Sequence, residues 1–406
     1  MSNHVSDKAF GLKPLKIQPT TMHTRLLVLL LAACYISCQP DTAPTKEAPT
    51  ATLTPEQQEA RDDSIALDMA YAAQARITRS VQPVAETDAI QAATPMDAAD
   101  DPAIWIHPTD PMRSVIYGSN KTGGITAYDL DGREIAYYPV GNINNVDVID
   151  GVPFGGKRVS LLGGTNRSDQ SLDLFLIDPV DGKLTDIADG ALGMDSTLID
   201  DVYGFCFAHH READKFYAIL NGKNGRVQQY ELIPSQGRIG IALRRTIDID
   251  SQTEGMVADA DLGYLYIGEE NRGVWKLRID PADTTRQLVA ATDTSNADIR
   301  YDVEGLTLYR DGDVGYLIVS SQGSFSYAVY ERQGDNRYIG SFKITASDTL
   351  DGAEETDGLD VTATPLGDAY PKGLLVVQDG FNYDGDTLRA QNFKYVSWRE
   401  VMGVLE

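Results

Sequence analysis

Six short polar segments carry most of the side chains in this sequence that could do chemistry. Each is rich in carboxylates or amides and stands directly before a run of apolar residues. The segments are Asp100-Asp101, Asn144-Asn145-Val146-Asp147, Asp200-Asp201-Val202-Tyr203, Glu254-Gly255, Asp302-Val303-Glu304 and Asp357-Gly358-Leu359-Asp360. Carboxylate and amide oxygens, with no His or Cys pair beside them, select hard cations, and calcium accepts an irregular cage of carboxylates more readily than magnesium does. If the segments meet in the fold, they predict a calcium site.

A second set of polar residues ends an apolar run in each of the same intervals. These tips are Asn120-Lys121, Asn166-Arg167, Lys223, Glu269-Glu270, Gln322 and Gln378-Asp379. Lys121, Arg167 and Lys223, together with Tyr203, suit a polyanionic substrate beside bound calcium. Taken singly, each polar segment is also consistent with a turn that opens a strand, and each cation with local charge balance. Six segments in register favour the cation site, because crowded carboxylates otherwise repel one another.

The composition excludes some classes of function. The chain has 406 residues, with 60 acids against 35 bases and a net charge of -25. This charge excludes a nucleic-acid binder that works by neutralising phosphates, and it argues against binding an anionic membrane through a basic patch. Two of the three cysteines, Cys34 and Cys38, lie beside an N-terminal apolar run. The body therefore holds only Cys206 and has no intramolecular disulfide.

The apolar runs that end in the tips predict the fold. Their centres are Ile116, Leu161, Ile219, Tyr266, Ile318 and Val376. A period of roughly 50 residues with four short strands per unit is typical of a β-propeller. We therefore predict an all-β fold, a six-bladed β-propeller with four antiparallel strands per blade. A parallel α/β fold would need helices between the strands, and the repeat region has no amphipathic helical stretch. In a propeller the polar segments and the tips converge on one face around the axis.

The first residues predict export. Arg25 precedes the apolar run 26–33, which is too short to span a bilayer and is typical of a secretory signal. Leu31-Ala32-Ala33-Cys34 resembles the site at which bacterial lipoproteins are lipidated, and Cys38 ends a looser second match; a plain signal peptide is the alternative. We predict a signal segment over residues 1–38, a flexible tether over 39–75 and the propeller over 76–406. The expected location is the outer membrane or cell surface, otherwise the periplasm or the medium, with a lipid anchor as the only membrane contact.

The polar segments resemble those of the β-propeller phytases, calcium-dependent phosphatases that act on myo-inositol hexakisphosphate (phytate). The resemblance runs from about residue 95 to Trp398 with its motifs in order. Besides the segments above, the matching stretches are Asp100-Asp101-Pro102-Ala103-Ile104-Trp105, Val202-Tyr203-Gly204-Phe205, Gln252-Thr253-Glu254-Gly255-Met256, Asp302-Val303-Glu304-Gly305-Leu306-Thr307, Ser320-Ser321-Gln322-Gly323, Asp357-Gly358-Leu359-Asp360-Val361 and Gln378-Asp379-Gly380.

The resemblance implies a role for each matching residue. Those that would hold or orient catalytic calcium are Asp100, Glu254, Glu269, Asp302, Glu304 and Gln322. Those that would hold substrate phosphate are Lys121, Arg167, Tyr203 and Lys223, with Tyr203 also counted in the catalytic set. One structural calcium site would comprise Asp101 with the backbone carbonyls of Pro102 and Val146, and another Asp357 and Asn382. One departure is Thr122, which stands where the family often has a second lysine.

The implied reaction is direct attack of a calcium-bound water on a phosphate monoester, which releases inorganic phosphate without a covalent intermediate. The implied substrate is phytate, itself calcium-bound, and we expect a monomer with several catalytic and structural calcium ions. Two alternatives remain. One is a non-catalytic, calcium-stabilised propeller that binds phosphorylated ligands or protein partners at the cell surface. The other is a lactonase-type propeller, which usually relies on a histidine that these segments lack.

Overall fold

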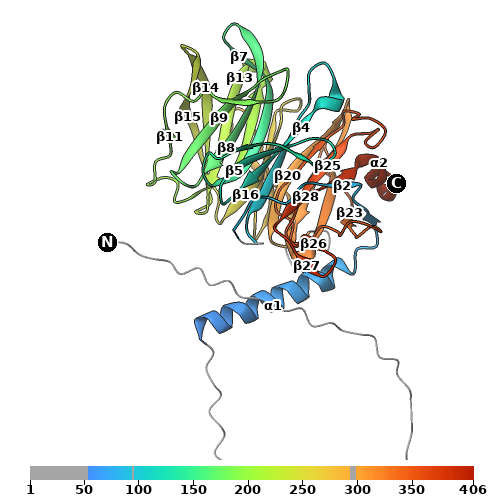
Figure 1. Cartoon of the computed structure of the whole chain (residues 1–406). Helices are drawn as coiled ribbons and strands as arrows, with labels where there is room; N and C mark the ends of the chain where they lie inside the picture. Colours follow the sequence, from blue (N-terminus) through green and yellow to red (C-terminus); the bar gives the residue numbers. More distant parts are fainter. Residues whose placement is uncertain (1–53, 94–95, 293–298) are drawn as a thin grey trace, which may run out of the picture. The chain divides into compact units, whose positions relative to one another are not determined.

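The computed structural model describes residues 54–93, 96–292 and 299–406, and most of them lie in β-strands. Six antiparallel sheets of four strands each form the blades of a propeller (Figure 1). Blades 1 to 3 are β3 (Ala99–Trp105), β4 (Val115–Asn120), β5 (Gly124–Tyr128) and β6 (Glu134–Tyr138); β7 (Ile143–Phe154), β8 (Lys157–Asn166), β9 (Ser171–Ile177) and β10 (Leu184–Asp186); and β12 (Val202–His210), β13 (Lys215–Gly222), β14 (Arg226–Ser235) and β15 (Arg238–Asp248).

The second half of the ring repeats the same plan. Blades 4 to 6 are β16 (Thr253–Asp259), β17 (Tyr264–Glu269), β18 (Gly273–Arg278) and β19 (Arg286–Ala291); β20 (Val303–Asp311), β21 (Val314–Ser321), β22 (Ser326–Glu331) and β23 (Tyr338–Ile344); and β24 (Leu359–Thr362), β25 (Leu374–Asp379), β28 (Asn392–Ser397) and β2 (Ala85–Glu86). The six predicted repeats are thus the six blades, and each repeat centre lies in the second strand of its blade.

Apolar side chains on both faces of each sheet hold neighbouring blades together. One buried cluster lies at each of the six contacts between blades. Between blades 1 and 2, for example, Trp105 and Tyr117 pack with Leu162 and Phe175. A blade buried on both faces explains why β4 and β25 are continuous apolar runs rather than alternating ones.

Segments near the N-terminus close the ring. β2 pairs with β28, so it supplies the outermost strand of blade 6, and Ala85 stands opposite Tyr395. β1 (Ser80–Val81) adds a parallel fifth strand to blade 5 through β23. The innermost strands of blades 1 and 6, β3 and β24, contact each other. The first and last blades are therefore joined both at the axis and at the periphery.

Further small elements lie outside the four-stranded blades. β11 (Leu192–Gly193) pairs with β9, and β26 (Tyr383–Asp384) forms a hairpin with β27 (Thr387–Leu388). Helix α2 (Trp398–Leu405) follows the last strand and buries Trp398 against Tyr309 of blade 5, with ring centroids 4.5 Å apart.

Helix α1 (Pro55–Gln74) corrects the predicted tether, because residues 55–74 of the range 39–75 are helical. The sequence there is rich in Ala and also contains Gln and Glu, which favour a helix even without an apolar face. Residues 63–406 form one compact unit, in which the Tyr71 hydroxyl donates to Glu354 Oε2 at 2.6 Å. The predicted signal segment and residues 39–53 lie outside the described residues. Within the part that is described, no helix is long and apolar enough to cross a membrane.

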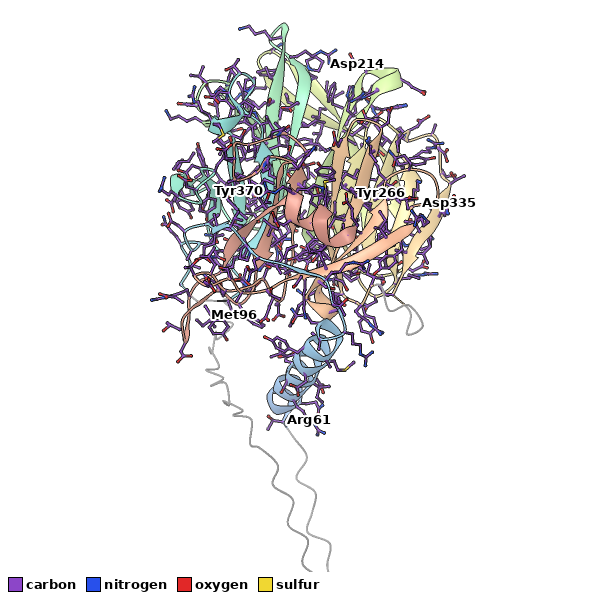
Figure 2. The ribbon with its side chains drawn as sticks, turned by 90° about the vertical axis from the view of Figure 1, so that its right-hand side faces the viewer. Arg61, Met96, Asp214, Tyr266, Asp335 and Tyr370 are labelled. Carbon is purple, nitrogen blue, oxygen red and sulfur yellow. The ribbon has the colours of Figure 1, made fainter. Side chains whose placement is uncertain are left out.

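The two ends of the propeller differ. Figure 2 labels Met96, just before β3, at one end of the propeller, and Asp214, in the turn between β12 and β13, at the opposite end. The first residues of the innermost strands lie at the end marked by Met96, and we call this end the rim. The turns between first and second strands lie at the other end.

Candidate functional site

A β-bulge at the start of the innermost strand gives each of the first five blades a site residue at the rim. In each case the pairing with the second strand shifts after the first residue, so that two residues are left out of the ladder. The first bulge residues are Asp100, Asn144, Tyr203, Glu254 and Glu304. In a regular strand, successive side chains alternate between the two faces of the sheet, and a bulge redirects a side chain out of this alternation. Bulges are common beside active sites. The sequence therefore presents one polar side chain per blade to the rim.

Glycine allows neighbouring bulges to touch. A Cβ atom on Gly204 would lie 1.9 Å from the carbonyl oxygen of Glu254, and one on Gly255 would lie 2.0 Å from the carbonyl oxygen of Glu304. No other residue leaves room for this approach. The Glu-Gly and Tyr-Gly pairs of the sequence thus bring the innermost strands of blades 3, 4 and 5 together at the rim.

Three buried carboxylates meet there. Glu254, Glu270 and Glu304 are 4%, 7% and 6% exposed, and each offers an oxygen within 4.8 Å of the other two. Glu304 Oε2 and Glu270 Oε1 have no hydrogen-bond partner among the described residues. Burial first, and then the charges of Glu254 and Asp357, raise the pKa of Glu304 well above its ordinary value. Burial, Glu254 and Asp302 raise the pKa of Glu270 to about 7. Orphaned oxygens among like charges fit a cation.

Acids of blades 1 and 6 lie around Lys121. Lys121 Nζ is 3.0 Å from Asp97 Oδ1, 3.3 Å from Asp357 Oδ2 and 3.7 Å from Asp100 Oδ1. Asp100 is 1% exposed, and its Oδ2 has no hydrogen-bond partner in the described chain. Burial raises the pKa of Asp100 well above its usual range, and Lys121 opposes that rise. Lys121 is therefore held among three carboxylates at the rim.

Blade 5 adds two predicted residues to this set. Gln322 Nε2 donates to Asp357 Oδ1 at 2.8 Å, and the Gln322 backbone N–H donates to the carbonyl oxygen of Asp302 at 3.0 Å. Burial raises the pKa of the half-buried Asp302. Asp302 also adds to the negative potential at Glu270. The structure thus brings Asp100, Asp302, Gln322 and Asp357 to the same rim as the three glutamates.

The predicted phosphate-binding residues of blades 2 and 3 are joined by Asp201. Arg167 Nη2 lies 2.9 Å from Asp201 Oδ2, and the Lys223 N–H donates to the Asp201 carbonyl oxygen at 3.3 Å. Lys223 Nζ lies 4.7 Å from the centre of the Tyr203 ring. Burial first, then Glu254 and Glu304, raise the pKa of Tyr203. Tyr203 therefore stays protonated, and Lys223 lies near enough to Glu270 to lower the pKa of that carboxyl.

The residues predicted for the two structural calcium sites have contacts of different kinds. Asp101 Oδ2 accepts from the Val146 N–H at 3.3 Å, and Pro102 follows Asp101 in β3. Asp357 and Asn382, the pair predicted for the other site, have separate partners. Asp357 contacts Lys121 and Gln322, whereas Asn382 Nδ2 donates to the carbonyl oxygen of Ala390 at 2.6 Å. Thr122, where the family often has lysine, donates its hydroxyl to Asn120 Oδ1 at 2.7 Å.

Glu270, not Glu269, joins the carboxylate cluster. Both oxygens of Glu269 are hydrogen-bonded within blade 4, Oε1 to Ser251 Oγ and Oε2 to Trp275 Nε1, each at 2.7 Å. Consecutive side chains at a strand end point to opposite faces, so only one of the two glutamates reaches the rim. Among the described residues, Glu270 is therefore better placed than Glu269 to hold a cation with Glu254 and Glu304, and a role for Glu269 stays a prediction.

A repeated position in the blades identifies Glu270. In five blades the residue directly after the second strand donates its backbone N–H to a residue just ahead of the bulge. These residues are Lys121, Arg167, Lys223, Glu270 and Gln322, and their acceptors are Ala98, Asn142, Asp201, Gln252 and Asp302. Alignment of the repeats at this position would have selected Glu270 from the sequence.

A family model and a curated relative identify one family. A family model described as Phytase matches residues 60–406. A 3-phytase of Bacillus subtilis (strain 168) is 41% identical over 320 residues, which cover 78% of this chain and 83% of the relative. Among solved structures, a calcium-binding regucalcin of Agrobacterium tumefaciens strain C58 has 15% identity and a TM-score of 0.48, over 79% of this chain and 95% of its own. A protein of unknown function from Bacteroides thetaiotaomicron VPI-5482 has 11% identity and a TM-score of 0.48, over 79% and 73%.

Proposed function

Because this chain belongs to the phytase family and is a 3-phytase-type phosphoric monoester hydrolase, we propose that it hydrolyses phytate in a calcium-dependent reaction by direct attack of water. The observation that carries the calcium dependence is the buried cluster of Glu254, Glu270 and Glu304 with its unpartnered oxygens. Oxygen donors in an irregular, strongly anionic arrangement suit calcium. Asp100, Asp302, Asp357 and Gln322 complete the set of residues that would hold it.

Calcium, when bound, would neutralise the charge of the phosphate and lower the pKa of a neighbouring water. The side chains of the protein bind the phosphate, stabilise its developing charge and transfer the proton. Lys121, Arg167 and Lys223 bind phosphate oxygens and stabilise the charge that develops on them as the ester bond breaks. Tyr203, kept protonated by its anionic neighbours, donates its hydroxyl to a phosphate oxygen. The Glu304 carboxylate orients the attacking water and takes one of its protons, and the inositol oxygen that leaves phosphorus takes up a proton from water.

Release of inorganic phosphate from phytate tests this proposal. With calcium we expect turnover, with excess chelator none, and after chelation only added calcium should restore it. Magnesium should restore little, because it prefers a smaller octahedral site and gives up its water reluctantly. Full turnover in chelator, with metal analysis showing calcium-free protein, would contradict the calcium dependence while leaving the family assignment intact.

The two adjacent glutamates of blade 4 give a sharper test. Glu270→Gln should lower turnover by roughly a hundredfold at saturating calcium, because it removes one of three charges from the cage. Glu269→Gln should keep most of the turnover and mainly lower the melting temperature, because it disturbs buried hydrogen bonds to Ser251 and Trp275. Steady-state kinetics and thermal unfolding of both variants make the comparison. If the effects were exchanged, Glu269 would be the calcium-holding residue and the placement of Glu270 would be wrong.

A further inference from the structure

Asn144 occupies in blade 2 the position that proposed site residues occupy in the other blades. It is the first residue of the bulge between Ile143 and Val146, as Asp100, Glu254 and Glu304 are in their own blades. Its side chain is fully buried, at 0% exposure. A buried amide at the rim needs partners for both its nitrogen and its oxygen.

The nitrogen of Asn144 has two partners, and both are acceptors. Nδ2 donates to Glu254 Oε1 at 2.8 Å and to Asn145 Oδ1 at 2.8 Å. Turning the amide over would set its oxygen against two other oxygens, so these contacts fix which atom faces Glu254. Asn144 Oδ1 then has no hydrogen-bond partner among the residues described. Because both atoms belong to one planar carboxamide, this orphaned oxygen lies beside the Glu254 carboxylate.

The neighbouring residue anchors the amide from the other side. Asn145 is 4% exposed, and its side chain lies close enough to the Asp101 carboxylate to lower the pKa of that carboxyl. Asp101 in turn accepts from the Val146 N–H. The Asn144-Asn145 pair therefore lies between Glu254 of blade 4 and Asp101 of blade 1, with Asn144 hydrogen-bonded to Glu254 and Asn145 beside Asp101. Such outer contacts hold a metal-binding carboxylate in one orientation.

We propose that Asn144 is a further member of the site, which positions the Glu254 carboxylate through Nδ2 and offers Oδ1 as a neutral oxygen donor to the same cation. The inference rests on the calcium-dependent function proposed above. A neutral amide suits this place because Glu254, Glu270 and Glu304 already crowd three negative charges together. Amide oxygens are ordinary calcium ligands, and this one adds no further repulsion.

Two substitutions separate the two roles. Asn144→Ala removes both atoms, and it should weaken calcium binding about tenfold in titration calorimetry and shrink the rise in melting temperature that calcium produces. Asn144→Asp keeps an oxygen in place but loses the donor and sets a like charge against Glu254. It should bind calcium about as tightly as the parent protein while turnover falls roughly tenfold.

Asn336→Asp is the matched control. Asn336 is also buried, and its amide donates to Tyr266 Oη at 3.1 Å and to the Glu331 carbonyl oxygen at 2.9 Å, at the outer side of blades 4 and 5. This variant should lower the melting temperature in chelator yet keep calcium affinity and turnover.

If Asn144→Ala likewise lowered only the melting temperature and kept calcium affinity and turnover, Asn144 would have a structural role alone. If Asn144→Asp kept full turnover, the positioning of Glu254 would be refuted, and equal loss of calcium affinity in both variants would refute the oxygen donor. Absence of calcium binding by the parent protein would instead overturn the proposed function.

Discussion

Glu304→Gln is expected to lower the turnover of phytate by roughly a hundredfold or more at saturating calcium, and Glu254→Gln by a similar factor. Each substitution keeps the shape of the side chain and removes one charge from a cluster whose oxygens lie within 4.8 Å of one another. The loss weakens the hold on the cation and, at Glu304, removes the carboxylate that takes a proton from the attacking water.

The same substitutions should not destabilise the calcium-free protein. The pKa of Glu304 is raised by burial and by the charge of Glu254, so an ionised Glu304 opposes folding when no cation is present. Turnover should therefore fall while the melting temperature in chelator stays level or rises. Glu231→Gln, which alters a carboxylate paired with Lys215 and Arg244 in blade 3, is the control and should keep its turnover. Near-native turnover of Glu304→Gln would remove this residue from the site.

The blades could be predicted from the sequence because each repeats the same burial pattern. A strand buried on both faces leaves a continuous apolar run, such as β4 and β25, and the polar residues at its end mark the rim. β1 and β2 escaped prediction because a two-residue strand has no periodicity. Their place depends on pairing with β23 and β28, hundreds of residues away. Helix α1 lies within the predicted tether, and its content of Ala, Gln and Glu favours a helix although the segment lacks an apolar face.

The site was predictable wherever the repeat determines the position of a residue. Asp100, Glu254 and Glu304 share a bulge position, and a local motif of an acid beside glycine or another acid marks it. The choice between Glu269 and Glu270 cannot be made from the local pair of glutamates, and it requires the repeats to be aligned at the residue that follows the second strand of each blade. The role of Asn144 depends on a contact with Glu254 across 110 residues. Such a contact becomes visible only once blades 2 and 4 are placed around one axis.

Removal of calcium is expected to lower the melting temperature by roughly ten degrees or more. The described part of the body has a single cysteine, which is free and buried, so no disulfide in that part stabilises the folded state. An ion that binds only the folded state adds about 2.7 kcal/mol per site at a hundredfold excess over its dissociation constant, and the predicted sites are several. Differential scanning calorimetry with calcium, magnesium or chelator measures the effect. Magnesium should recover little of the lost stability.

The dependence of this stability on pH has a definite sign. Burial, followed by Glu254 and Asp302, raises the pKa of Glu270 from its ordinary value of 4.5 to about 7. A carboxyl group that holds its proton more tightly when folded favours folding while it is protonated. Its contribution is therefore present below about pH 4.5 and is lost as the pH rises towards 7. In chelator, the melting temperature should fall over this interval, whereas with calcium the ionised carboxylates bind the ion and the fall should be smaller. Carboxylates that repel one another in the calcium-free site must stabilise the folded protein once calcium is bound between them. A melting temperature in chelator that rises between about pH 5 and 7 would therefore show that these carboxylates are not the calcium-binding groups. A melting temperature that does not respond to calcium at neutral pH would show the same.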